Sequence, residues 1–241
     1  MIGVLGGTFD PIHFGHLRPA LDCLQALGLD EVRLVPLKVA VHRPQPMAAA
    51  GVRLAMVQAA VAGVSGLVAD GRELDRAGPS YSYDTLASLR QELGPRVPIC
   101  LLVGADAFHG FLTWHRPAEI MDLAHLVVMQ RPDAPEPSDQ VLRRWLSDLG
   151  CAGPQELRRR PAGRILRLPV TQLDISSSRI RTLMRAGQSP RYLLPDSVLE
   201  MAEAAGLYQD STARADHDCS TPGASRPVQP ETEETVCSLN N

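Results

Sequence analysis

The chain has 241 residues, 44% of them hydrophobic, and a formal net charge of −3, which fits one cytoplasmic domain with a packed core and a short appendage. Its apolar runs are too short for a signal peptide or a membrane-spanning helix, so no membrane partner is expected. The acidic residues 211–241 account for the whole net charge, and the neutral remainder, without a basic block, argues against a nucleic-acid partner.

Short apolar runs alternate along the chain with stretches of helical periodicity. The runs predict strands at Ile2–Leu5, Val32–Pro36, Leu67–Ala69, Ile99–Val103, Leu126–Met129 and Ile165–Leu168. The periodic stretches predict helices at Leu17–Leu27, Val52–Val61, Thr85–Leu93, Ala118–Leu123, Val141–Leu149, Ile180–Met184 and Val198–Ala205. This alternation predicts an α/β fold with a parallel sheet, helices on both faces and closing helices at the C-terminal end.

The segment from residue 211 onward contains no Phe, Tyr, Trp, Ile or Met and is rich in Ser, Thr, Pro and Glu. Such a segment cannot bury enough apolar area to offset the entropy of ordering it. We therefore predict a folded domain over residues 1–210 and a disordered acidic tail over residues 211–241.

A glycine pair and two histidines follow the first predicted strand. Gly6 and Gly7 allow backbone N–H groups to approach a ligand closely. His13 and His16 lie three residues apart at the start of a helix expected over Gly15–Leu27, so they share one face near its positive end. The pattern predicts an anion site for phosphates with two imidazole donors.

Other interpretations of this loop fit less well. A P-loop needs a Gly-Lys pair, but Lys38 is the only lysine, and residues 3–8 do not match GxGxxG. A zinc site at His13 and His16 lacks an evident third ligand. Either histidine alone could be an ordinary surface residue at a helix cap, but the run GGTFDPIHFGH as a unit favours the phosphate site.

A second candidate phosphate element is the run Ile175–Arg181, with the sequence ISSSRIR, before a predicted helix. Serines are good helix N-caps, and Arg181, one turn into the helix, can reach back to a phosphate with two hydrogen bonds. An ordinary cap is the alternative, but a triphosphate needs cationic groups from more than one side.

On these two motifs the chain resembles the HxGH nucleotidyltransferases, and more narrowly the bacterial nicotinate-nucleotide adenylyltransferases, over residues 1–209. Further segments that carry the resemblance are VHRP at 41–44, PSYSYDTL at 79–86, GAD at 104–106, TWH at 113–115 and RP at 131–132. The resemblance implies a Rossmann-like doubly wound fold. It also implies adenylyl transfer from ATP to nicotinate mononucleotide in NAD biosynthesis, with Mg²⁺. The sequence shows no cluster of carboxylates for a metal, so the ion is expected to arrive on the ATP phosphates, with no metal ligands from the protein.

The resemblance also assigns roles to particular residues. The residues expected to act on the transferred phosphates are His13, His16 and Arg181. The residues expected to bind ATP are Gly6, Gly7, Thr8, Phe9, Gly104, Asp106, Arg131, Ser176 and Ser178. The residues expected to bind the acceptor are His42, Arg43, Thr85, Trp114 and His115, with Trp114 stacked on the pyridine ring and Thr85 near its carboxylate.

Several alternatives stay open at this point. Nicotinamide mononucleotide or phosphopantetheine could replace nicotinate mononucleotide as the acceptor, and a non-catalytic module could bind ATP without releasing pyrophosphate. An NAD-dependent oxidoreductase is disfavoured by the missing GxGxxG. The sequence leaves the oligomeric state open, so a homo-oligomer is compatible with it.

Overall fold

The computed structural model describes residues 1–39, 45–131 and 134–209. The predicted acceptor-binding residues His42 and Arg43, and the predicted disordered tail over residues 211–241, lie outside this part of the chain. Residues Met1–Gln209 form one compact unit.

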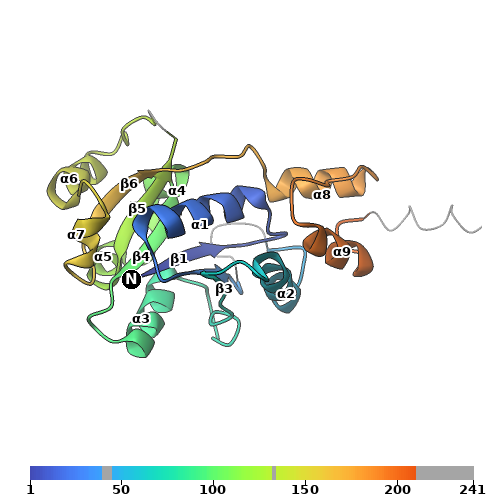
Figure 1. Cartoon of the computed structure of the whole chain (residues 1–241), viewed down its shortest axis with the longest axis horizontal. Coiled ribbons are helices and arrows are strands. Elements are labelled where there is room, and N and C mark those ends of the chain that lie inside the picture. Colours follow the sequence, from blue (N-terminus) through green and yellow to red (C-terminus); the bar gives the residue numbers. More distant parts are fainter. Residues whose placement is uncertain (40–44, 132–133, 210–241) are drawn as a thin grey trace, which may run out of the picture. The chain divides into compact units, whose positions relative to one another are not determined.

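A six-stranded parallel sheet forms the centre of this unit (Figure 1). The strands are β1 (Ile2–Gly7), β2 (Glu31–Pro36), β3 (Leu67–Ala69), β4 (Ile99–Gly104), β5 (His125–Gln130) and β6 (Ile165–Pro169). Their order is β3-β2-β1-β4-β5-β6, which is the order of a doubly wound Rossmann-like sheet. All six predicted strands are confirmed, with ends that differ by at most two residues.

Helices cover both faces of the sheet, as predicted. One buried cluster joins the sheet to α1 (Phe14–Leu27), α2 (Ala50–Val61), α7 (Pro154–Arg158), α8 (Ser177–Arg185) and α9 (Asp196–Ala204). A second cluster joins the other face to α3 (Ser82–Leu93), α4 (Ala105–His109), the 3₁₀ turn η1 (Phe111–Thr113), α5 (Pro117–Leu123) and α6 (Gln140–Leu149). The sequence did not predict α4 and α7, because five residues are too few to show a helical period.

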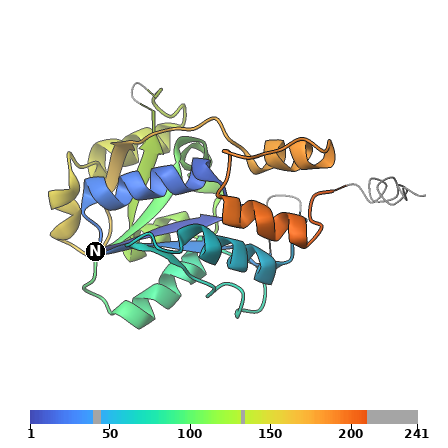
Figure 2. The same ribbon diagram turned by 45° about the vertical axis from the view of Figure 1, so that its right-hand side comes forward.

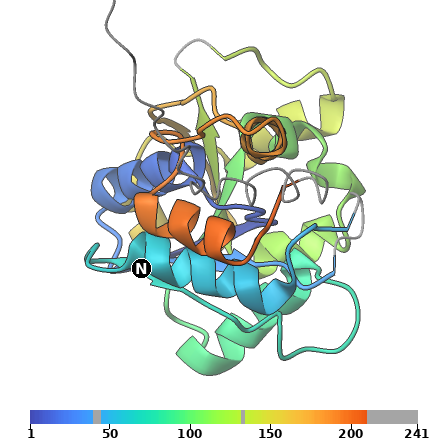
Figure 3. The same ribbon diagram turned by 90° about the vertical axis from the view of Figure 1, so that its right-hand side faces the viewer.

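The strands are buried on both faces because alternate residues point to opposite clusters. In β1, Ile2 and Val4 belong to the cluster around α3, whereas Leu5 belongs to the cluster around α1. The continuous apolar runs of the sequence follow from this two-sided burial. Near the C-terminal end of the unit, α9 lies along α2 (Figures 2 and 3).

Candidate active site

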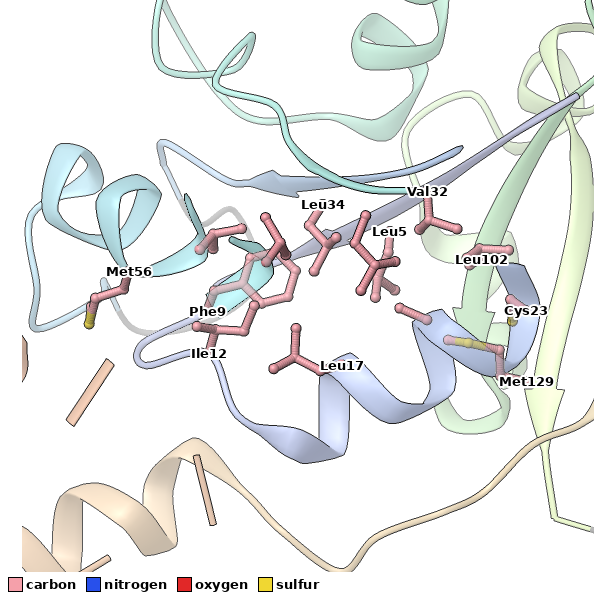
Figure 4. Close-up of a cluster of buried hydrophobic side chains, with 14 of the residues drawn as sticks. Leu5, Phe9, Ile12, Leu17, Cys23, Val32, Leu34, Met56, Leu102 and Met129 are labelled. Carbon is pink, nitrogen blue, oxygen red and sulfur yellow. The ribbon is translucent and has the colours of Figure 1, made fainter. Parts of the chain in front are cut away.

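The loop after β1 is anchored by an aromatic ring in the core. Phe9 has a positive φ of 50° and is only 1% exposed, and its ring lies in the same cluster as Leu5 and Leu17 (Figure 4). A Cβ on Gly7 would lie 2.7 Å from the Phe9 ring, so this close turn requires glycine. The side chain of Phe9 therefore holds the loop in place and leaves only its backbone to face a ligand.

His13 and His16 lie against each other where this loop enters α1. Their rings are stacked with centroids 3.8 Å apart and planes inclined by 29°, and Phe9 meets His16 edge-on at 5.0 Å. The Nδ1 atoms of both histidines are buried and have no hydrogen-bond partner among the described residues. Buried polar atoms normally find a partner, so two orphaned ring nitrogens in one place point to a polar ligand.

Both imidazoles are held neutral near pH 7. Burial lowers the pKa of His13 to about 4, and burial together with the neighbouring His13 lowers the pKa of His16 to about 3. A neutral imidazole carries one N–H donor and one acceptor nitrogen. The pair can therefore donate two hydrogen bonds to an anion without carrying a positive charge itself.

The serine–arginine element of α8 docks on this loop. The Ser177 hydroxyl donates to the Pro11 carbonyl at 2.9 Å, and the Arg181 guanidinium donates to the Asp10 carbonyl at 2.7 Å and to the Ser178 hydroxyl at 3.3 Å. Ser176 caps α8 by accepting from the Arg179 N–H. The structure thus brings the two predicted phosphate elements together.

The close approach of α8 depends on Gly15. A Cβ at this position would lie 2.9 Å from the His13 ring and 3.0 Å from the carbonyl oxygen of Ile175. Any side chain here would push apart the two elements that meet at the histidine pair. The glycine of the HxGH motif is therefore a packing requirement of the site.

A buried network beneath the loop involves residues that the sequence interpretation did not single out. Asp10 accepts hydrogen bonds from the Tyr208 hydroxyl and from the N–H groups of Met47 and Ala48. Arg53, 1% exposed, donates to the carbonyl oxygens of Thr8, Leu37 and Ala48. These contacts tie the loops after β1 and β2 together. They join residues far apart in the chain, so no local pattern could reveal them.

A cavity of about 400 Å³ opens at the carboxyl ends of β1, β2 and β4, and the Gly6–Thr8 turn forms part of its lining. In sheets of this topology, ligands bind where the connections of neighbouring strands diverge to opposite faces, and β1 and β4 form such a point. A Cβ on Gly6 or on Gly104 would meet nothing within 4 Å. Both glycines therefore leave open space beside the cavity.

Aromatic rings form one wall of the cavity. Trp114, half-buried, packs on Phe111 with ring centroids 5.2 Å apart. His115 is exposed and stacks on Tyr81 at 4.3 Å. Trp114, His115 and Tyr81 all line the cavity. A flat aromatic ligand would find stacking partners here.

The predicted acceptor residue Thr85 is not among the described residues that line the cavity. It is 3% exposed, and its hydroxyl donates to the Glu73 carboxylate. The residue of α3 that lines the cavity is Ser82, in the first turn of the helix. Glu73 also lines the cavity, although it is only 7% exposed and no sequence motif drew attention to it.

The remaining predicted residues divide between two places. Those that line the cavity are Gly6, Gly7, Thr8, Gly104, Asp106, Trp114 and His115. The histidine pair itself is His13 and His16, and Ser176, Ser178 and Arg181 belong to the α8 element that docks on the same loop. Arg131 follows β5, is exposed and lies outside the cavity lining.

Two further findings bear on ligands. Within residues 1–39, 45–131 and 134–209, no three His, Cys, Asp or Glu side chains are grouped closely enough to hold a metal ion. No helix in the same part of the chain is long and apolar enough to cross a membrane.

Comparisons with known proteins identify the family. The cytidylyltransferase-like family matches residues 4–183. A Pseudomonas syringae pv. tomato protein named "Probable nicotinate-nucleotide adenylyltransferase" is 49% identical over 86% of this chain and 93% of its own length. A Methylococcus capsulatus protein of the same name is 47% identical over 86% of this chain and 99% of its own length. The Plasmodium falciparum nicotinic acid mononucleotide adenylyltransferase complexed with NaAD shares the fold, with a TM-score of 0.63, 15% identity and coverage of 86% and 96%. The chain therefore belongs to the cytidylyltransferase-like family and, within it, to the nicotinate-nucleotide adenylyltransferases.

Proposed function

We propose that this enzyme transfers the adenylyl group of ATP to nicotinate mononucleotide, giving nicotinate adenine dinucleotide and pyrophosphate for NAD biosynthesis. The observation that carries the assignment to this chain is the stacked pair of neutral histidines with unpartnered ring nitrogens. The loop that carries the pair accepts a hydrogen bond from Ser177 of α8, and the Gly6–Thr8 turn at the start of this loop borders the cavity. Phosphates and a flat base each have a complementary place in this arrangement.

The reaction is an in-line displacement. A phosphate oxygen of the mononucleotide attacks the α-phosphorus of ATP, a new P–O bond forms, and the bond to pyrophosphate breaks. The attacking phosphate is already anionic, so no general base is needed, and catalysis rests on positioning and charge stabilisation. His16 and His13 donate N–H groups to the phosphates, with His16 nearest the transferred one. Arg181 supplies positive charge from the α8 side.

The predicted binding residues of both nucleotides meet at one cavity, whose lining includes Gly104 and Asp106 as well as Trp114 and His115. Ser176 and Ser178 hold the β- and γ-phosphates, the backbone of Gly6–Phe9 contacts ATP, and Gly104, Asp106 and Arg131 border the adenosine. Trp114 stacks on the pyridine ring, and the first turn of α3 with the backbone near His115 receives its carboxylate. Thr85 belongs to that first turn, and in this proposal it contributes to acceptor binding by helping to position the turn. His42 and Arg43 remain acceptor-binding predictions of the sequence.

Mg²⁺ enters this proposal only with the nucleotide. The donor atoms at the phosphate site are imidazole nitrogens, hydroxyls and a guanidinium, whereas Mg²⁺ prefers carboxylate, phosphate and water oxygens. The described residues offer no cluster of metal ligands, and the phosphates of ATP would hold the ion. The cytoplasmic location stays a prediction of the sequence, and the oligomeric state stays open.

The test is pyrophosphate release from ATP with each acceptor offered separately. We expect release and dinucleotide formation with nicotinate mononucleotide, and less or none with phosphopantetheine or with no acceptor. A higher kcat/KM with nicotinamide mononucleotide than with nicotinate mononucleotide would make the nicotinamide nucleotide the preferred acceptor. ATP binding without release under any condition would favour a non-catalytic module and contradict the proposal.

A further inference from the structure

The charged side chains that line the cavity are both acidic. Among the described residues that line it, Glu73 and Asp106 carry formal charge, and none is a lysine or an arginine. This is unexpected for a cavity that receives a nucleotide, because nucleotide phosphates are anionic. The acidic lining therefore calls for a cationic group on the part of the ligand that enters the cavity.

Glu73 is held in place on one side only. Its Oε1 accepts from the Thr85 hydroxyl, whereas its Oε2 is buried and has no hydrogen-bond partner among the described residues. Burial raises the pKa of Glu73, and the hydroxyls of Thr85 and Ser80 and the charge of Arg76 offset this rise only in part. A buried carboxylate oxygen without a hydrogen-bond partner is costly, so a cationic group on the ligand would relieve the cost that Arg76 leaves.

The acceptor nucleotides considered above carry such a charge on their ring. The pyridine nitrogen of nicotinate mononucleotide is bonded to ribose, so the ring is a cation that has no N–H to donate. The ring can compensate the negative charge of Glu73 electrostatically without a hydrogen bond. This agrees with an Oε2 atom that has no hydrogen-bond partner among the described residues. The rings of Tyr81, Trp114 and His115 in the same cavity add faces that favour a cationic ring.

We infer that Glu73 supplies the counter-charge for the positively charged pyridine ring of the acceptor and so determines specificity for a cationic ring. This inference rests on the proposed function and deepens it. The ring carboxylate and the ring nitrogen lie at different positions of the ring. The first turn of α3 can therefore meet the carboxylate while Glu73 faces the ring charge.

The local packing explains how the charge is fixed. The Ser80 hydroxyl accepts from the N–H groups of Lys38 and Val39, at 2.9 and 3.3 Å, and the Lys38 ammonium donates to the Arg76 carbonyl at 3.0 Å. These contacts fasten the segment between Glu73 and α3 to the end of β2. A carboxylate fixed in this way needs little reorganisation when a ligand binds.

The test compares two acceptors that differ in ring charge. Nicotinate mononucleotide is paired with benzoate C-riboside 5′-phosphate, in which an uncharged phenyl ring replaces the pyridine cation and the carboxylate, ribose and phosphate are kept. We expect wild-type kcat/KM to favour the cationic ring and Glu73→Gln to reduce that preference by roughly tenfold, the order expected for partly buried charges. Glutamine keeps an oxygen that can accept from Thr85.

The control is Asp75→Asn, which removes the same charge from an exposed residue two positions away and outside the described cavity lining. It should leave the preference unchanged. Arg76→Gln removes a positive charge that partly compensates the Glu73 carboxylate, so it should increase the preference for the cationic ring. Because this expected change is opposite to that of Glu73→Gln, the variant tests the inference even if Glu73→Gln does not fold.

An equal fall of kcat/KM for both acceptors in Glu73→Gln would show a structural role only and overturn the inference. If wild-type enzyme turns over neither acceptor, the proposed function fails. Glu73 is then tested by calorimetric binding of the two nucleotides to wild type and to the same variants. Equal affinities of wild type for the cationic and uncharged rings would overturn the inference in that case.

Discussion

The guanidinium of Arg181 donates a hydrogen bond to the backbone carbonyl of Asp10 over 2.7 Å, across a sequence separation of 171 residues. The same guanidinium lies 3.9 Å from the Asp10 carboxylate and donates to the Ser178 hydroxyl on its own helix. Arg181 is thus held by the loop that carries the histidine pair. This arrangement orients Arg181 before a phosphate arrives.

Replacement of Arg181 should lower activity without unfolding the protein. We expect Arg181→Ala to reduce kcat by about 10²-fold, the usual loss when one donor to developing charge is removed. Arg181→Lys should recover only part of the rate, because a lysine cannot form paired hydrogen bonds to a phosphate. Arg179→Ala, on the same helix and exposed, is the control and should keep near-wild-type rates. Equal losses in the two alanine variants would contradict the assignment.

Replacement of His16 should cost more activity than replacement of a histidine outside the site. We expect His16→Ala to lower kcat by roughly 10²–10³-fold while its circular dichroism stays that of wild type. His109, exposed at the end of α4 and outside the cavity lining, provides the control variant His109→Ala. The rate of pyrophosphate release at saturating ATP gives kcat for both variants, and only His16→Ala should show the loss. Near-wild-type turnover in His16→Ala would refute its role at the transferred phosphate.

The histidine pair should make the folded state sensitive to acid. Folding lowers the pKa of His13 to about 4 and of His16 to about 3 from an ordinary value of 6.5. Between pH 6.5 and about 4, the unfolded chain therefore binds protons that the folded chain does not. The free energy of unfolding should fall as the pH is lowered through this window.

Urea unfolding at several pH values measures this effect. His16→Gln cannot take up the proton, so its stability should fall less steeply than that of wild type between pH 6.5 and 4. The carboxylates titrate alike in both proteins and cancel in the difference. Parallel curves for the two proteins would show that the burial of His16 does not affect its protonation.

We expect bound ATP to occupy the open space beside Gly104. A Cβ there would meet no atom within 4 Å, and Gly104 has an ordinary negative φ of −69°. Gly104→Ala should therefore fold normally and raise KM for ATP several-fold. Gly51→Ala in α2, which is equally open, should leave KM unchanged and stabilise the fold by about 0.5–1 kcal/mol. Unchanged KM in Gly104→Ala would remove Gly104 from the nucleotide site.

The buried Tyr208 should stabilise the fold through Asp10. Its hydroxyl donates to the Asp10 carboxylate at 2.6 Å, and hydrogen bonds to charged groups contribute about 1.5–3 kcal/mol. Tyr208→Phe should lower the free energy of unfolding by that order. Tyr192→Phe is the matched control, because Tyr192 also has a positive φ but is 84% exposed, and it should change stability by less than about 0.5 kcal/mol. Equal effects in the two variants would contradict the role of the Asp10 contact.

Much of the site's chemistry could be predicted from local sequence. Gly6, Gly7, His13 and His16 follow the first strand in one short run, and their spacing already indicated histidine donors at a helix start. The six strands were predictable because burial on both faces gives continuous apolar runs. The exception was short elements such as α4, whose five residues show no period.

Contacts between distant segments could not be predicted in this way. Thr85 was expected at the acceptor, but the fold places its hydroxyl on Glu73 and brings Ser82 to the cavity instead. Arg53, Tyr208 and Glu73 belong to no local motif.

The sequence by itself determined the parallel α/β architecture and the loop predicted to bind phosphate, because strand burial and helix-start chemistry are local. Only the tertiary structure decided that α8 docks on the loop beside Gly15, that burial keeps His13 and His16 neutral, and that a buried carboxylate lines the cavity. These features depend on burial and on partners far apart in the chain, which composition and spacing do not encode.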